Sequence, residues 1–172
     1  DRTAVTLEPD LQRGAEHFAA MRLGAVVIGH SSSSILGGAG WDAAVVEAIS
    51  AIVRPETRVT TNGIDGQAAM MAAGVRRPYI VLPPWFNDAT AEAAMAYYRG
   101  LGVEPVGPLR YDPGPGWRDV PYGEMYPRGL GFEQQVEPLY TQIRDTCPAG
   151  ADGVFIAGTG FRCVAILDSL ER

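Results

Sequence analysis

The chain of 172 residues contains no lysine, and all fourteen of its basic residues are arginine. It therefore has no lysine for a Schiff base, for the attachment of pyridoxal phosphate or for a phosphate-binding P-loop. The only histidines are His17 and His30, and the only cysteines are Cys147 and Cys163. These four residues do not cluster at the spacing of zinc ligands. We therefore expect no zinc site and no cofactor.

Further absences limit the partners and the compartment. A formal charge of −6 leaves no basic face for nucleic acid, whose binding requires one. No apolar run approaches the roughly 18 residues of a membrane span, and no basic and then apolar stretch opens the chain as a secretory signal would. Two cysteines are too few for a disulfide scaffold. We expect a cytoplasmic protein that binds neither nucleic acid nor membranes.

Short apolar strands alternate with helices along the chain. Strands are predicted at 25–28, 58–61, 79–82, 103–106 and 154–157. Helices are predicted at 7–22, 41–53, about 65–73, 89–101, 132–145 and 162–171. Pro138 lies inside one of these helices and predicts a kink or a late start. The alternation predicts an α/β protein with parallel sheets flanked by helices.

The stretch from Gly29 to Gly38, GHSSSSILGG, links the first predicted strand to the next helix. Ligands of parallel sheets bind at such carboxyl ends of strands. A serine-nucleophile elbow would need a glycine where Ser33 stands and a histidine later in the chain, and no histidine follows His30. A phosphate loop fits the serines but lacks lysine and a glycine-rich fingerprint. A carboxylate is also an anion, and the same donors would serve it.

A second turn has a similar pattern. GAVVIGHSS at 24–32 and DGVFIAGTG at 152–160 are both apolar strands followed by small or hydroxyl residues. In register, His30 aligns with Gly158. One interpretation is that any strand-to-helix turn favours small residues. The other is an internal duplication, with two lobes facing each other across one cleft.

The order of these pieces resembles the aspartate/glutamate racemase superfamily, in its arylmalonate decarboxylase and maleate cis–trans isomerase branch. The matching segments are GHSSSSILGGAGWD, the run from TTNGIDGQAAM to GLGVEPV, and ADGVFIAGTGFRCVAILDSLE. The resemblance implies two pseudo-symmetric α/β lobes, here 1–85 and 86–172. It also implies that their facing turns bind a small carboxylate substrate and stabilise an enediolate without a cofactor. Because the family has a further strand at each end, we expect either a piece of a longer protein or reduced ends.

The resemblance also implies roles for particular residues, and the chain differs from the family at the catalytic positions. The two catalytic cysteine positions fall on His30 and Gly158, so both cysteines are replaced. Cys163 lies in the following helix and is expected to pack as a small apolar residue. The active-site tyrosine of the branch falls on Trp85.

The hydroxyl and amide positions of the resemblance form an oxyanion hole. They fall on Ser31, Ser32 and Thr159, with the backbone N–H groups near Gly158 and Gly160. Such preorganised donors stabilise the charge that builds on a carboxylate as it becomes an enediolate.

Proton delivery to carbon is assigned to His30, the only group at either turn with an unperturbed pKa near neutrality. The alternative role for His30 is structural, as a histidine bonded to a backbone carbonyl beneath the loop. Because Gly158 leaves one face of the carbon without an acid or base, a one-sided decarboxylation or isomerisation is favoured over racemisation. Covalent addition, as in a cysteine-dependent isomerase, is disfavoured because imidazole replaces the thiolate poorly.

Three further residues carry two interpretations each. Thr61 and Asn62 either reach the same cleft or cap the next helix. Arg162 either pairs with a substrate carboxylate or is a solvated residue at a helix start.

The segment 108–131 is too long and too rich in proline and glycine for an ordinary connection. Its aromatic residues are Tyr111, Trp117, Tyr122 and Tyr126. They would either cap an active site or anchor a contact in a homo-oligomer.

The sequence thus predicts a cofactor-independent lyase or isomerase that acts next to a carboxylate of a small mono- or dicarboxylic acid. The alternative is a non-catalytic carboxylate-binding protein, or a divergent member of the family with another proton-transfer or elimination chemistry.

Overall fold

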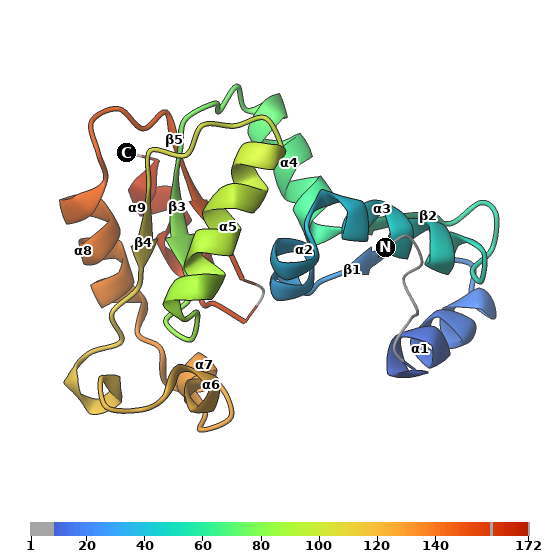
Figure 1. Cartoon of the computed structure of the whole chain (residues 1–172), viewed down its shortest axis with the longest axis horizontal. Coiled ribbons are helices and arrows are strands. Elements are labelled where there is room, and N and C mark those ends of the chain that lie inside the picture. Colours follow the sequence, from blue (N-terminus) through green and yellow to red (C-terminus); the bar gives the residue numbers. More distant parts are fainter. Residues whose placement is uncertain (1–8, 159, 172) are drawn as a thin grey trace. The chain divides into compact units, whose positions relative to one another are not determined.

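The computed structural model describes residues 9–158 and 160–171. The chain divides into two compact units, residues 1–69 and 70–172, which Figure 1 colours from blue to green and from green to red. The change of unit falls earlier than the lobe boundary after residue 85 expected from the sequence, because the strand at 78–82 pairs within the second unit. Among the described residues, no helix has the length and apolar character needed to cross a bilayer.

The first unit is a pair of parallel strands with helices packed against it. Its elements are α1 (Pro9–Ala19), β1 (Ala25–Ile28), α2 (Ser31–Gly37), α3 (Ala39–Ser50), β2 (Arg58–Thr61) and the start of α4 (Asn62–Ala72). β1 pairs with β2 in register Ile28↔Thr61. Burial alternates along β1, so Val26 and Ile28 face the core. Val45 and Ile49 of α3 complete that core and are almost fully buried.

The second unit is a three-stranded parallel sheet in the order β4-β3-β5. The strands are β3 (Pro78–Leu82), β4 (Gly107–Arg110) and β5 (Gly153–Ile156), and the longer helices are α5 (Asp88–Gly100) and α8 (Val136–Thr146). Every residue of β3 is buried, as expected for a central strand covered on both faces. The shorter helices are η1 (Pro115–Trp117), α6 (Tyr122–Met125), α7 (Leu130–Glu133), η2 (Val164–Ile166) and α9 (Leu167–Leu170).

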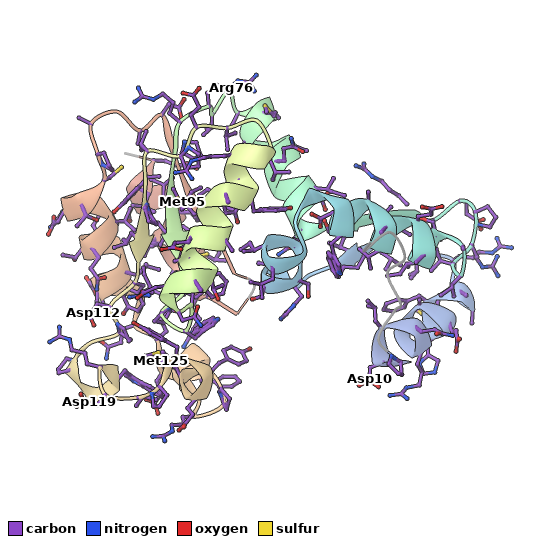
Figure 2. The ribbon with its side chains drawn as sticks, in the orientation of Figure 1. Asp10, Arg76, Met95, Asp112, Asp119 and Met125 are labelled. Atoms are coloured by element: carbon purple, nitrogen blue, oxygen red, sulfur yellow. The ribbon has the colours of Figure 1, made fainter. Side chains whose placement is uncertain are left out.

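The short helices between β4 and α8 lie at one end of this sheet. Figure 1 shows α6 and α7 beyond the carboxyl ends of the strands of the second unit. Figure 2 labels Arg76 at the opposite end, and Asp112, Asp119 and Met125 on the side of the short helices. The segment predicted as a long irregular loop therefore folds where ligands of parallel sheets bind.

The predicted fold class is confirmed, because both sheets are parallel and flanked by helices. The strands predicted at 25–28 and 58–61 coincide with β1 and β2. The prediction of a strand at 103–106 is wrong, because β4 runs from Gly107 to Arg110. Two valines suggested the earlier segment, but the register Tyr79↔Gly107 places the pairing later. Pro108 is tolerated there because β4 is an edge strand.

Helix α2 was not expected from the sequence. Its four serines are poor helix formers in isolation, yet they form its first turns and buried hydrogen bonds hold two of them. The helix predicted at 132–145 is divided into α7 and α8 by extended backbone at Gln134 and Gln135. Pro138 lies in the first turn of α8, which confirms the late start.

Candidate functional site

A buried carboxyl group links the end of β2 to two helices of the first unit. Asp42 of α3 is 3% exposed, and its Oδ1 accepts hydrogen bonds from the hydroxyls of Ser34 (2.7 Å) and Thr61 (2.6 Å). Thr61 Oγ1 in turn accepts from the backbone N–H of Ile64 at 3.2 Å. A buried polar group of this kind persists when hydrogen bonds offset its desolvation. The Asp42 network thereby fixes α2 and α3 against β2.

A second side-chain contact lies beside the Asp42 network. Ser31 is 9% exposed, and its Oγ accepts a hydrogen bond of 2.7 Å from Asn62 Nδ2. With Asn62 Nδ2 turned toward Ser31, the hydroxyl hydrogen of Ser31 has no acceptor among the described residues and can serve a ligand. Asn62 Oδ1 is also buried, and it accepts no hydrogen bond from the described residues. Leaving such an acceptor unsatisfied costs about 1–3 kcal/mol.

His30 precedes α2 and is exposed. Its Nδ1 lies 2.8 Å from Ser33 Oγ, and the tautomer decides which atom donates. When Ser33 donates to Nδ1, the imidazole carries its hydrogen on Nε2 and presents it outward. The structural alternative was a hydrogen bond from the ring to a backbone carbonyl. Within the described residues the ring makes no such bond.

No side-chain network like that of Asp42 is found among the described residues of the second turn. Gly158 follows β5 with φ of +105°, a conformation that glycine adopts and other residues rarely do. A Cβ atom at this position would also lie 3.1 Å from Pro83 Cγ. A cysteine here, where the resemblance places the second catalytic cysteine, would therefore be strained in this conformation. Thr159, the predicted hydroxyl donor of this turn, lies outside the described residues.

Aromatic rings cover the second turn. Trp85 packs edge-on against Tyr126, with ring centroids 5.0 Å apart, and against Phe161, at 6.2 Å. Tyr126 lies so close to Gly160 that a Cβ there would be 2.9 Å from Tyr126 Cε2. One of the four aromatic residues predicted to cap a site therefore contacts the second turn itself. Tyr111 is buried beneath it, with its ring centroid 5.6 Å from that of Phe161.

Gln134, which sequence reasoning missed, holds the residue after Phe161. Its Oε1 accepts from the backbone N–H of Arg162 at 3.0 Å, and its Nε2 donates to the Arg162 carbonyl at 2.9 Å. Gln134 is 5% exposed and lies in the extended link between α7 and α8. The guanidinium of Arg162 donates to the carbonyl of Phe132 at 2.9 Å but is otherwise exposed. Its predicted pairing with a carboxylate stays a prediction.

The predicted site residues therefore fall into separate groups. His30, Ser31, Ser32 and Asn62 lie at the first turn, and Trp85, Gly158, Gly160 and Arg162 lie at the second. Thr61 is fully buried and its hydroxyl is engaged, as the helix-capping interpretation expects. For Asp42, Ser34 and Gln134, no sequence pattern indicated the contacts that they make.

Neither cysteine has the character of an activated thiol. Cys163 packs against the core beside Phe161, and burial raises the pKa of its thiol. Burial also raises the pKa of Cys147. A thiol with a raised pKa is a poor nucleophile at neutral pH. Within residues 9–158 and 160–171, no group of three or more histidine, cysteine, aspartate or glutamate side chains is placed to hold a metal ion.

No protein-family model and no curated protein matches this sequence. Solved structures do match the fold. The maleate isomerase Iso from Pseudomonas putida superposes with a TM-score of 0.76 at 14% identity, over 93% of this chain and 60% of that protein. The maleate cis-trans isomerase of Nocardia farcinica bound to TRIS superposes with a TM-score of 0.74 at 13% identity, over 98% of this chain and 68% of that protein.

Unliganded arylmalonate decarboxylase superposes with a TM-score of 0.70 at 19% identity, over 94% of this chain and 64% of that one. The chain thus spans less than two thirds of the length of this decarboxylase and of the Pseudomonas isomerase. At these identities the likeness concerns the fold. This chain has the α/β fold of maleate isomerase and arylmalonate decarboxylase, with parallel sheets flanked by helices.

Proposed function

We propose that the chain is a cofactor-independent enzyme that acts at the carbon next to a carboxylate of a small carboxylic acid. The observation that carries the proposal is the Ser31 hydroxyl. Its oxygen accepts a hydrogen bond from Asn62 Nδ2, and its own hydrogen is not donated to any described residue. The hydroxyl lies just after the carboxyl end of the parallel strand β1. The fold shared with an isomerase and a decarboxylase of small carboxylic acids supports the same chemistry.

The reaction would develop negative charge on a carboxylate. Loss of CO2 from a malonate breaks a carbon–carbon bond and leaves its electron pair in an enediolate. Donors preorganised around that charge stabilise it, and one lost donor typically costs a factor of about 10²–10³ in kcat. Ser31 and Ser32 are the proposed hydroxyl donors of the first turn. The N–H groups near Gly158 and Gly160 are those proposed for the second.

Proton delivery completes the reaction, and we assign it to His30. In the imidazolium form Nδ1–H can donate to the Ser33 hydroxyl, while the hydrogen on Nε2 is the proton that would pass to the carbon and leave a neutral imidazole. No second acid or base faces the reacting carbon in this proposal, because glycine stands at position 158. A decarboxylation or an isomerisation with one-sided protonation is therefore favoured over racemisation.

The test is a substrate panel in D2O followed by NMR, with phenylmalonate, methylmalonate, maleate, a hydantoin and aspartate. The expected result is deuterium incorporation or CO2 release with at least one malonate, reduced at least a hundredfold in His30→Ala. A His17→Ala variant, which alters an exposed histidine of α1, serves as the matched control and should retain full turnover.

Two results would count against the proposal. Turnover that is unchanged in His30→Ala would remove His30 as the proton donor. Binding of the carboxylates without any turnover across the panel would instead support a carboxylate-binding protein.

A further inference from the structure

Tyr126 places a phenol on the second turn. It follows α6 in the segment between β4 and α8, and its ring stands edge-on to Trp85 at an interplanar angle of 63°. A Cβ atom at Gly160 would lie 2.9 Å from Tyr126 Cε2 and 3.1 Å from its hydroxyl oxygen. The hydroxyl, and not only the ring, therefore reaches the turn.

Two glycines from distant segments make room for this ring. Besides Gly160, a Cβ atom at Gly131 would lie 3.0 Å from Tyr126 Cε2. Side chains at either position would force the ring to move, since contacts this short are rare between real atoms. The absence of side chains at Gly131 and Gly160 leaves space for the ring, and packing against Trp85 accounts for an aromatic residue at position 126. Packing does not account for its hydroxyl.

The Tyr126 hydroxyl has no hydrogen-bond partner among the described residues, and Tyr126 is 51% exposed. Tyr126 borders a chamber of about 380 Å³ beside the turn. The chamber walls include Gly160, Phe161 and Arg162, and the apolar side chains of Phe132 and Val164, which are 84% and 81% exposed. A chamber with apolar walls and a few convergent polar groups is typical of a small-molecule site.

We propose that Tyr126 is a substrate-contacting residue, whose hydroxyl donates a hydrogen bond to the substrate carboxylate at the second turn. This inference rests on the proposed function. It assigns a side-chain donor to the turn where Gly158 offers none, and it gives the segment 108–131 a catalytic role besides covering the turn. The donor acts on the charge of the enediolate, so its contribution is expected mainly in kcat.

The test compares Tyr126→Phe with Tyr122→Phe. Tyr126→Phe removes one oxygen and keeps the ring against Trp85. Tyr122 is the first residue of α6, the short helix that Tyr126 follows, but the Arg110 guanidinium lies over its ring, 4.7 Å from the ring centroid. With the best malonate of the panel, Tyr126→Phe should lower kcat about 10²-fold and raise KM no more than about tenfold. Tyr122→Phe should match the wild type, and both variants should keep the wild-type Tm.

A Tyr126→Phe enzyme whose kcat stays within twofold of wild type overturns the inference while leaving the proposed function intact. If the wild type turns over no compound of the panel, the proposed function fails first, and binding then decides the inference. Titration of phenylmalonate, followed by NMR, should give a Kd about tenfold weaker in Tyr126→Phe. An unchanged Kd, or no binding of phenylmalonate to the wild type, overturns the inference.

Discussion

The two turns of this chain look alike in sequence but are held in different ways. At the first turn, buried side chains do the holding, because Asp42 accepts from Ser34 and Thr61. At the second turn, the backbone of Arg162 is clamped by Gln134, and aromatic rings cover glycine. The comparison teaches that similar strand-to-helix turns can offer different donors to a ligand. In the proposed site, the first turn would supply side-chain hydroxyls, and the second would supply backbone N–H groups and the Tyr126 phenol from another segment.

The largest effect on stability is expected from removing the Asp42 carboxyl group, which is the centre of the hydrogen-bond network of the first turn. Asp42→Ala leaves the buried hydroxyls of Ser34 and Thr61 without their acceptor. We expect the free energy of unfolding to fall by about 3 kcal/mol, measured by urea denaturation with circular dichroism. Asp42→Asn keeps a side-chain oxygen for both hydroxyls and should lose about half as much. Equal losses in the two variants would show that the hydrogen bonds are not what holds the turn.

The second turn is expected to be sensitive to its backbone instead. Gly158→Ala places a Cβ atom on a residue with φ of +105° and 3.1 Å from Pro83 Cγ. The expected loss of stability is about 2 kcal/mol. Gly116→Ala is the matched control, because no atom lies within 4 Å of a Cβ there and its φ is not positive. If Gly158→Ala is as stable as Gly116→Ala in the same denaturation series, the turn does not require glycine.

A smaller effect is expected from the clamp on Arg162. Gln134→Ala removes both the acceptor of the Arg162 N–H and the donor to its carbonyl. Water reaches part of the vacated space, so we expect a loss of about 1–2 kcal/mol. Gln134→Glu keeps only the acceptor and should fall between the wild type and Gln134→Ala near pH 7. A Gln134→Glu variant less stable than Gln134→Ala would contradict this assignment of the two bonds.

The smallest effect concerns the thiol beside the second turn. Because burial raises the pKa of the Cys163 thiol, less of the reactive thiolate is present at pH 7 than in an exposed cysteine. Alkylation by iodoacetamide, followed by mass spectrometry, should be slower at Cys163 than in free glutathione and should accelerate as the pH rises. Substitution Cys163→Ala should leave turnover of the best malonate unchanged. Rapid alkylation at pH 7 would instead mark Cys163 as a displaced catalytic cysteine.

Local patterns in the sequence were enough to predict the α/β class and the strands β1 and β2. Alternating apolar runs and helical faces depend on neighbouring residues only. Helix α2 could not be predicted in this way, because its serines have little helix propensity and the hydrogen bonds to Asp42 and Asn62 hold them in place. For β4, the partner strand decided the register, and two valines pointed to the wrong residues.

The same division applies to the candidate site. His30 and Ser31 were found because they follow a strand directly in the sequence. Asp42 and Gln134 were not, since each acts on residues distant in sequence. The segment 108–131 was expected either to cap a site or to anchor a contact in a homo-oligomer, but only the fold shows that Tyr126 is the residue over Gly160.

A double-mutant cycle tests most directly whether the two turns serve one reaction. The variants Ser31→Ala, Tyr126→Phe and their combination would be compared with the wild type by kcat/KM for the best malonate, from CO2 release in D2O. Two donors to one enediolate are expected to be coupled, so the double variant should lose clearly less than the product of the single losses. Losses that multiply, or a Ser31→Ala enzyme as active as the wild type, would contradict the account.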